Sequence, residues 1–181
     1  CAPGRRTLPR RPVAPVAPTP APAPVAFTEA QLRSIQSLGP WPLPARADPS
    51  NRVSGRPDAI AFGAMLFADP RLSRDGSLAC ATCHRADRAF TDGLPRGRGA
   101  VDVDRNTTTL HNVGGQRWYG WDGAADNLWA MSLRPMLDSR EMGGNVAHLA
   151  ALLRTYPALQ ARYAAVFRQP PSADDARVAA D

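Results

Sequence analysis

The residues best suited to chemistry in this 181-residue chain are two cysteines and a histidine in the pentapeptide Cys80-Ala81-Thr82-Cys83-His84. This pattern, C-x-x-C-H, is the attachment signature of a c-type haem. Thiols at positions i and i+3 of a helical turn lie on one side of it, where both can add to the vinyl groups of one haem edge. The adjacent imidazole can then bind the iron as its proximal ligand. We therefore expect one covalent haem c, held by Cys80, Cys83 and His84.

Three other roles for the pentapeptide are weaker. A structural zinc site needs about four ligands, and Cys1, His111 and His148 are scattered along the chain. A thioredoxin-like redox pair belongs to a βαβ unit, and the flanking sequence has little strand pattern. A disulfide within C-x-x-C would be strained. Haem attachment remains the leading interpretation, with His111 expected in a loop near the haem edge and His148 on a helix.

Short helices and long loops must position this haem motif. A capping-box pattern at residues 28–31 predicts a helix through about residue 38, and Pro57 suits the first turn of a second helix that ends before residue 69. Further helical segments are expected at 78–84, 126–137 and 146–167. Pro157 predicts a kink or break in the last of these, and residues 91–123 have the composition of loop. The predicted fold class is mostly α, a cytochrome c-like helical domain with long haem-wrapping loops.

The composition divides the chain into three regions. Residues 1–26 are rich in proline and alanine, cannot build a core, and are expected to form a disordered, semi-rigid spacer. Residues 27–170 carry enough apolar side chains for a compact haem domain. Residues 171–181 are expected to begin a linker to a second haem domain that this sequence lacks.

Charge and hydropathy indicate where the protein works. The net charge is +6 and all 22 basic side chains are arginines, but no aromatic residues are interleaved with the basic tail to stack on bases, so nucleic acid is not an expected partner. No apolar run reaches the roughly 18 residues of a membrane-spanning helix. Haem c attachment normally takes place outside the cytoplasm, so we expect a removed export signal and a periplasmic protein. Cys1, followed by a flexible spacer, is typical of a bacterial lipoprotein and predicts a lipid anchor.

Several motifs between about residues 62 and 167 resemble, in the same order, the N-terminal domain of bacterial di-haem cytochrome c peroxidases and their MauG-like relatives. The first is similar to the family's G-x-x-L-F-x-D-P-R-L-S lead-in, the second is C-x-x-C-H, and later ones match R-N-T-P-T-L-x-N, W-D-G and E-M-G. The matching segments are 62–73, 80–84, 90–93, 105–112, 121–123 and 141–143. Each motif is weak alone, but together they are specific.

The resemblance implies roles for individual residues. His84 corresponds to the proximal ligand of the peroxide-reacting haem, and Glu141 to the acid–base residue on the opposite face. Trp121 corresponds to the tryptophan that lies between two haems and assists electron transfer. Asn106 corresponds to a residue whose side-chain oxygen helps to bind calcium between the domains, in keeping with the preference of this ion for oxygen ligands.

The sequence also departs from the family pattern. Many members carry a second histidine in the loop after the haem motif, which ligates the iron in the resting state and leaves on activation. Residues 86–105 contain no histidine, and Arg98 falls near the expected position. Thr108 replaces the usual proline, and Met131 stands where glutamine is common. The resemblance therefore implies an open or water-bound distal face, closer to the MauG-like branch.

These features predict a peroxidase module that reduces hydrogen peroxide to water. Electrons would come from a second haem or from a protein donor, such as a small c-type cytochrome or a cupredoxin. A MauG-like oxidation of a protein substrate is an alternative within the same family. A monohaem electron-transfer cytochrome c is the competitor from another class, and it needs a sixth ligand, usually methionine. The matches at Glu141 and Trp121 favour the peroxidase.

Overall fold

The computed structural model describes residues 25–39, 44 and 47–181, in two units, 1–40 and 41–181, that are considered separately. In the first unit, α1 (Glu29–Gln36) begins with a reciprocal capping box. Thr28 Oγ1 accepts a hydrogen bond from the Gln31 amide at 3.3 Å, and Gln31 Oε1 accepts one from the Thr28 amide at 2.9 Å. The predicted helix start is confirmed, and the helix ends slightly earlier than expected. Cys1 and most of the predicted spacer lie outside the described residues.

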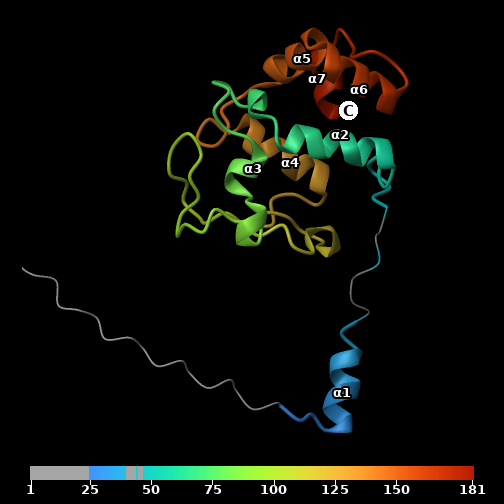
Figure 1. Cartoon of the computed structure of the whole chain (residues 1–181), viewed down its shortest axis with the longest axis vertical. Helices are drawn as coiled ribbons and strands as arrows, with labels where there is room; N and C mark the ends of the chain where they lie inside the picture. The colour runs from blue at the N-terminus through green and yellow to red at the C-terminus, as the bar shows by residue number, and fades with distance from the viewer. Residues whose placement is uncertain (1–24, 40–43, 45–46) are drawn as a thin grey trace, which may run out of the picture. The chain divides into compact units, whose positions relative to one another are not determined.

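The second unit is built from helices joined by long loops (Figure 1). Its α-helices are α2 (Pro57–Phe67), α3 (Cys80–Cys83), α4 (Leu128–Leu137), α5 (Val146–Thr155), α6 (Pro157–Phe167) and α7 (Asp175–Ala180). Three short 3₁₀ helices are η1 (Pro70–Leu72), η2 (Ala86–Arg88) and η3 (Val113–Gly115). The described residues contain no β-strand beyond isolated bridges. The predicted fold class, a mostly α cytochrome c-like domain with long loops, is confirmed.

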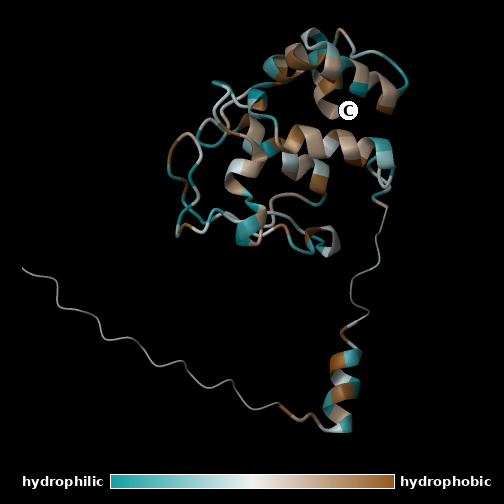
Figure 2. Ribbon diagram, in the orientation of Figure 1, coloured by the Kyte–Doolittle hydropathy of each residue, from teal (hydrophilic) through white to brown (hydrophobic). Residues whose placement is uncertain are grey.

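Helices α2, α5, α6 and α7 enclose the hydrophobic core of the second unit. Leu159, Tyr163 and Val166 of α6 are almost fully buried, with Phe62 of α2 and Val178 of α7 beside them in the same cluster. Figure 2 shows that most of α2 beyond its first turn is apolar. In Figure 1, α3 and α4 lie across α2 from the α5–α7 group. The core therefore fixes α2, and the chain leaves α2 toward the haem motif. No helix in the described part of the chain is long and apolar enough to cross a bilayer.

The segment predicted as one long helix is broken at Pro157, as its proline indicated. Tyr156 has extended backbone angles, φ −92° and ψ 110°, and separates α5 from α6. Pro157 occupies the first position of α6, where its missing N–H would have had no helical partner. The break lets α5 and α6 fold back on each other, so that the apolar faces of both contribute to one core.

The segment 171–181 contains a helix that the sequence did not predict. The Asp174 carboxylate accepts hydrogen bonds from the amides of Ala176 and Arg177 and starts α7. Helix α7 packs on α5, and Val178 is 2% exposed. This segment therefore belongs to the packed unit, whereas its continuation into a linker stays a prediction.

Candidate haem site

The loop that leads into the haem motif is held by a buried serine. Ser73 Oγ donates a hydrogen bond to the Pro70 carbonyl at 2.8 Å and accepts one from the Leu78 amide at 3.0 Å. Asp69 reinforces the turn, because its carboxylate accepts hydrogen bonds from the Arg71 amide and guanidinium. These bonds explain the polar residues of the lead-in motif, which fix the chain just before Cys80.

The haem motif itself forms the single helical turn α3. The Ala79 amide donates to Thr82 Oγ1 at 3.0 Å, and the His84 amide donates to the Cys80 carbonyl at 2.9 Å. Both cysteines are free and half-buried, and burial raises the pKa of each thiol. The turn thus presents two unpaired thiols and the imidazole from one short segment, as the C-x-x-C-H spacing predicted.

A backbone carbonyl fixes the orientation of the His84 ring. His84 Nδ1 lies 3.0 Å from the Phe90 carbonyl oxygen. Because a carbonyl only accepts, Nδ1 carries the proton, and Nε2 is left to bind a metal. Phe90 and the preceding Ala89 both have left-handed backbone angles, φ 57° and 54°. Thr109 Oγ1 donates to the Ala89 carbonyl at 2.5 Å, which ties this strained turn to a distant loop.

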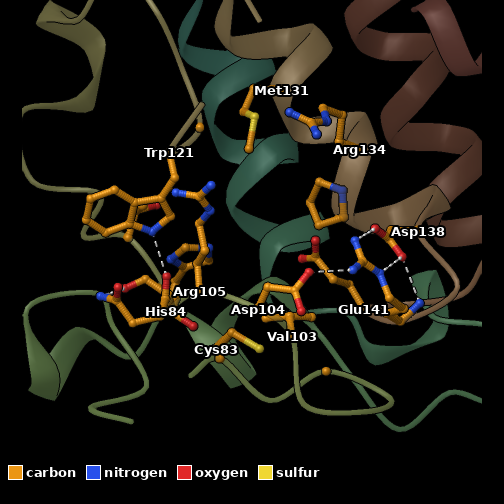
Figure 3. Close-up of a pocket in the computed structure, with 18 of the residues that line it drawn as sticks. Cys83, His84, Val103, Asp104, Arg105, Trp121, Met131, Arg134, Asp138 and Glu141 are labelled. Carbon is orange, nitrogen blue, oxygen red and sulfur yellow. Dashed lines mark hydrogen bonds and ion pairs between the residues drawn. The ribbon is translucent and has the colours of Figure 1, made fainter. Parts of the chain in front are cut away.

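Two neighbouring cavities, of about 710 and 590 Å³, open beside the haem motif and share several lining residues. The shared lining residues include Cys83, His84, Trp121, Met131 and Glu141. Figure 3 shows His84 and Cys83 at this site, with Trp121 on one side and Glu141 on the other. The residues that line the two cavities come from loops and helices that are far apart in the sequence, so the fold brings the separate motifs together.

The chemistry of these linings fits a haem c. The smaller cavity carries apolar side chains such as Phe67, Leu110 and Leu128 beside the Cys80 thiol, which suits the faces of a porphyrin. The larger one is bordered by arginines, including Arg105 and Arg134, which suit the two carboxylates of a haem. Cys80, Cys83 and His84 would hold the group, in agreement with the sequence interpretation.

Glu141 lines both cavities from the loop after α4. Burial raises the pKa of its carboxyl above the ordinary value, and the charge of Asp138 adds to the rise, although basic groups nearby oppose it. Within the described residues its carboxylate accepts no hydrogen bond, whereas its backbone carbonyl accepts one from the Ala100 amide at 2.9 Å. The side chain is therefore free to exchange a proton with a molecule in the cavity.

Trp121 and Asn106 meet although they come from different motifs. The Trp121 indole Nε1 donates to the Asn106 carbonyl oxygen at 2.9 Å (Figure 3). Trp121 is 55% exposed and lines both cavities, so it can contact both a haem and a second domain. The Asn106 side chain donates weakly to the Thr107 carbonyl at 3.4 Å. Among the described residues no cluster of three or more His, Cys, Asp or Glu side chains could hold a metal, and the calcium ion stays a prediction.

Several contributors to the site were not predicted. The Phe90 carbonyl leaves no signal in a sequence, because every residue has one. Gly99 lies close to the backbone of Glu141, whereas the sequence predicted only that residues 91–123 are loop. His111 packs edge-on against Phe90, with ring centroids 5.3 Å apart, which agrees with its expected loop position.

The remaining histidine and methionines divide into packing and cavity residues. His148 lies on α5, and its Nε2 is 2.8 Å from the Arg71 carbonyl, which indicates a packing role. Met136 packs against the core, and Met65 is exposed. Met131 and Met142 line a cavity, and Met131 lines both. Met131 is therefore the best-placed methionine for the alternative role of an iron ligand.

Known proteins with similar sequences and structures are haem enzymes. The family of di-haem cytochrome c peroxidases matches residues 57–180. The methylamine utilization protein MauG of Methylorubrum extorquens is 39% identical over 114 residues, which cover 62% of this chain and 31% of that protein. A MauG-like protein associated with microbial copper homeostasis has a similar structure, with a TM-score of 0.65 and 29% identity over 78% of this chain and 44% of that one.

A second solved structure is similar as well. It is the diheme peroxidase BthA from Burkholderia thailandensis E264, with a TM-score of 0.62 and 26% identity over 76% of this chain and 37% of that chain. The chain spans about a third of the length of the curated relatives it matches.

Proposed function

The chain belongs to the di-haem cytochrome c peroxidase family, and from this premise we propose that it is the peroxide-reducing haem module of such an enzyme. The observation that carries the proposal is the half-buried Glu141 carboxyl, which lines the same cavities as His84. Peroxide reduction needs an imidazole that binds the iron and a nearby carboxyl that can exchange a proton. His84 and Glu141 provide these two groups in the same cavities. Overall, hydrogen peroxide, two electrons and two protons give two water molecules.

The chain's own residues supply positioning and proton transfer. When bound, the haem supplies the iron at which peroxide is reduced. Cys80 and Cys83 tether it, and His84 presents Nε2 because Nδ1 is occupied by the Phe90 carbonyl. Glu141 takes a proton from one peroxide oxygen and delivers it to the other, so that the O–O bond breaks and water leaves. Its raised pKa suits this exchange, because a general acid–base must change protonation near the working pH.

Electrons would reach the site through Trp121. Its indole lines the cavities and is also half-exposed, which suits contact with a redox partner. We propose a second haem domain as the immediate electron source, refilled by a small c-type cytochrome or a cupredoxin. A protein substrate oxidised through Trp121, in the manner of the MauG-like branch, is the alternative within the same framework.

Replacing Glu141 by glutamine tests the acid–base role. The amide has nearly the same shape but cannot accept the proton, so the peroxide step should slow by about 10²- to 10⁴-fold while haem content stays unchanged. Glu29→Gln is the matched control, because Glu29 is the only other glutamate and its side chain is 91% exposed on α1. Stopped-flow absorbance of the haem-loaded protein with peroxide measures the rate. An unchanged rate in Glu141→Gln would remove Glu141 from the mechanism.

A monohaem electron-transfer cytochrome is the second candidate function. It is favoured by one observation, the position of Met131 in the lining of both cavities, from which its thioether could reach the iron. A methionine ligand would close the iron to peroxide and favour reversible electron transfer. The two functions therefore predict different iron coordination.

We also propose a calcium ion near Asn106 and a periplasmic location. Calcium takes six to eight oxygen ligands, so Asn106 would need further oxygens from a second domain or from water. Because the Asn106 carbonyl binds the Trp121 indole, removing the ion with a chelator should change tryptophan fluorescence and slow electron delivery. Addition of calcium should reverse both changes. If the chelator has no effect on either signal, the calcium proposal is wrong.

A further inference from the structure

A small hairpin, residues 97–105, lies against the segment that carries Glu141. Its own hydrogen bonds run from the Gly97 amide to the Arg105 carbonyl at 2.8 Å and from the Val103 amide to the Gly97 carbonyl at 2.9 Å. At its tip, the amides of Ala100 and Val101 donate to the carbonyls of Glu141 and Arg140, at 2.9 and 3.1 Å. The hairpin therefore binds the backbone of Glu141 directly and leaves the carboxyl to the cavity.

The hairpin lies so close to the backbone of residues 140 and 141 that only glycine fits at position 99. A Cβ atom placed on Gly99 would lie 2.5 Å from Glu141 Cα and 2.6 Å from the Arg140 carbonyl oxygen. Both are backbone atoms, which cannot move aside as a flexible side chain could. Gly99 does not have the left-handed backbone that would itself require glycine. Glycine is therefore required at position 99 because there is no room for a Cβ atom, and not because of its backbone angles.

Three further contacts connect this hairpin to the rest of the site. The Arg140 guanidinium forms ion pairs with Asp104 of the hairpin at 3.1 Å and with Asp138 at 3.0 Å. At the start of the hairpin, the Arg98 amide donates to the Asp92 carboxylate at 3.2 Å, and the Cys83 thiol lies 3.5 Å from the Arg98 carbonyl. One loop thus touches both a haem-attaching cysteine and the segment of the proposed acid–base residue.

We propose that Gly99 is a positioning residue for Glu141. Because Gly99 has no side chain, the hairpin can come close enough for the Ala100 and Val101 amides to bind the carbonyls of Glu141 and Arg140. We call these two hydrogen bonds the clamp, and they hold the Glu141 carboxyl in the cavity. This rests on the proposed function, because it deepens the role of Glu141 there. The clamp acts only through backbone atoms, so it leaves the carboxyl free to exchange protons. A side chain at position 99 would push residues 140 and 141 away and misplace the carboxyl, although the Glu141 side chain itself would be unchanged.

Hydrogen exchange in the haem-loaded, full-length protein tests the clamp without reference to activity. In the wild type, the Ala100 and Val101 amides should exchange at least about tenfold more slowly than those of Asp102 and Asp104, which donate no hydrogen bond within the described part of the chain. In Gly99→Ala the two protected amides should exchange about 5- to 150-fold faster, the range set by overpacking a close contact. Gly63→Ala is the matched control, because nothing lies within 4 Å of a Cβ added there on α2.

The peroxide rate tests whether the clamp acts through Glu141. Gly99→Ala should slow the peroxide step at unchanged haem content, and it should have no further effect in the Glu141→Gln background. Effects that multiply in the double variant would show that Gly99 acts elsewhere and would overturn the proposal. If Glu141→Gln leaves the rate unchanged, the proposed function fails, while the exchange result still decides whether the clamp exists.

Two other results would overturn the proposal. One is a Gly99→Ala protein whose Ala100 and Val101 amides stay as protected as those in Gly63→Ala. The other applies even if Gly99→Ala cannot fold: in the wild type itself, Ala100 and Val101 amides that exchange as fast as those of Asp102 and Asp104 would show that no clamp is present.

Discussion

At the scale of single residues, the site depends on a carboxyl that is only partly shielded from water. Burial raises the pKa of Glu141 above its ordinary value of 4.5, with Asp138 as the second cause. The ionised form takes up the peroxide proton, so the raised pKa sets the acidic limit of the reaction. Asp69 shows the opposite effect, because the hydrogen bonds from Arg71 lower the pKa of its carboxyl. The first carboxyl is suited to proton exchange and the second to holding a turn.

The pH dependence of the peroxide step follows from the raised pKa. As pH falls through the pKa of Glu141, the carboxylate that accepts the proton is lost and the rate should drop. The midpoint of this acidic limb should lie above pH 4.5. Stopped-flow rates measured across the acid range would show it, and the limb should be absent from Glu141→Gln. A rate independent of pH down to 4.5 would contradict this role of Glu141.

Asp69→Asn should destabilise the protein by about 1–3 kcal/mol at neutral pH, because it weakens the charge-assisted bonds to Arg71 in a buried position. The folded-state pKa lies below the ordinary 3.8, so this stabilisation is present above pH 3.8 and is lost as pH falls through the lowered value. Denaturant unfolding at neutral and acidic pH measures both effects.

Asp87→Asn is the control for this variant. Its carboxylate pairs with Arg85 at 2.7 Å but is 65% exposed, so its loss should destabilise the protein clearly less than the loss of the Asp69 carboxylate. Equal losses in the two variants would show that burial of Asp69 contributes nothing.

At the scale of elements, the strained turn after the haem motif determines the environment of His84. Ala89 and Phe90 adopt left-handed backbone angles that cost energy in non-glycine residues, and the bond from Thr109 to the Ala89 carbonyl holds them there. This turn aims the Phe90 carbonyl at His84 Nδ1. Hydrogen bonding at that nitrogen raises the basicity of the ligand and favours the ferric state.

Thr109→Val should therefore raise the reduction potential of the haem, because a loosened turn weakens the bond to His84. Losing most of a hydrogen bond of about 1 kcal/mol corresponds to a rise of up to roughly 40 mV for a one-electron couple. Spectroelectrochemical titration measures the shift. Thr155→Val, which removes a similar hydroxyl bond to the Ala151 carbonyl on α5, should leave the potential unchanged. Equal shifts in both variants would point to a general structural effect.

Local signals in the sequence were sufficient for most helices and for the helical turn that carries the C-x-x-C-H motif. The capping residues at the start of α1, the break at Pro157 and the C-x-x-C-H turn each depend on a few neighbouring residues, and each is confirmed. Helix α7 was missed because it is short and is stabilised by packing on α5. The contact of Gly99 with Glu141 joins residues far apart in the chain, and no local pattern reports such a contact.

At the scale of the whole molecule, the chain corresponds to only part of each curated relative. It spans about a third of the length of the curated relatives it matches, and its family is di-haem. The site described here has one haem motif, a proton-exchanging carboxyl and a half-exposed tryptophan. Our proposal therefore assigns peroxide chemistry to this module and electron supply to a second haem domain, with Trp121 at the junction.

Trp121→Phe in the full-length protein should separate these two roles. Electron delivery should slow about tenfold or more, which is about 1.4 kcal/mol of barrier, while the first reaction with peroxide should keep its rate. Trp118→Phe is the matched control, since Trp118 is exposed in the same loop but does not line either cavity. Stopped-flow mixing with a reduced donor cytochrome distinguishes the two steps. A similar slowing in Trp118→Phe would argue against a specific path through Trp121.

The state of the iron in the haem-loaded ferric protein tests the central claim most directly, and optical and EPR spectra recorded before and after adding hydrogen peroxide report it. A peroxidase site formed by His84 and Glu141 predicts a high-spin, five-coordinate or water-ligated haem whose spectrum changes rapidly with peroxide. A low-spin haem with histidine and methionine ligands that does not react with peroxide would contradict the account and identify an electron-transfer cytochrome.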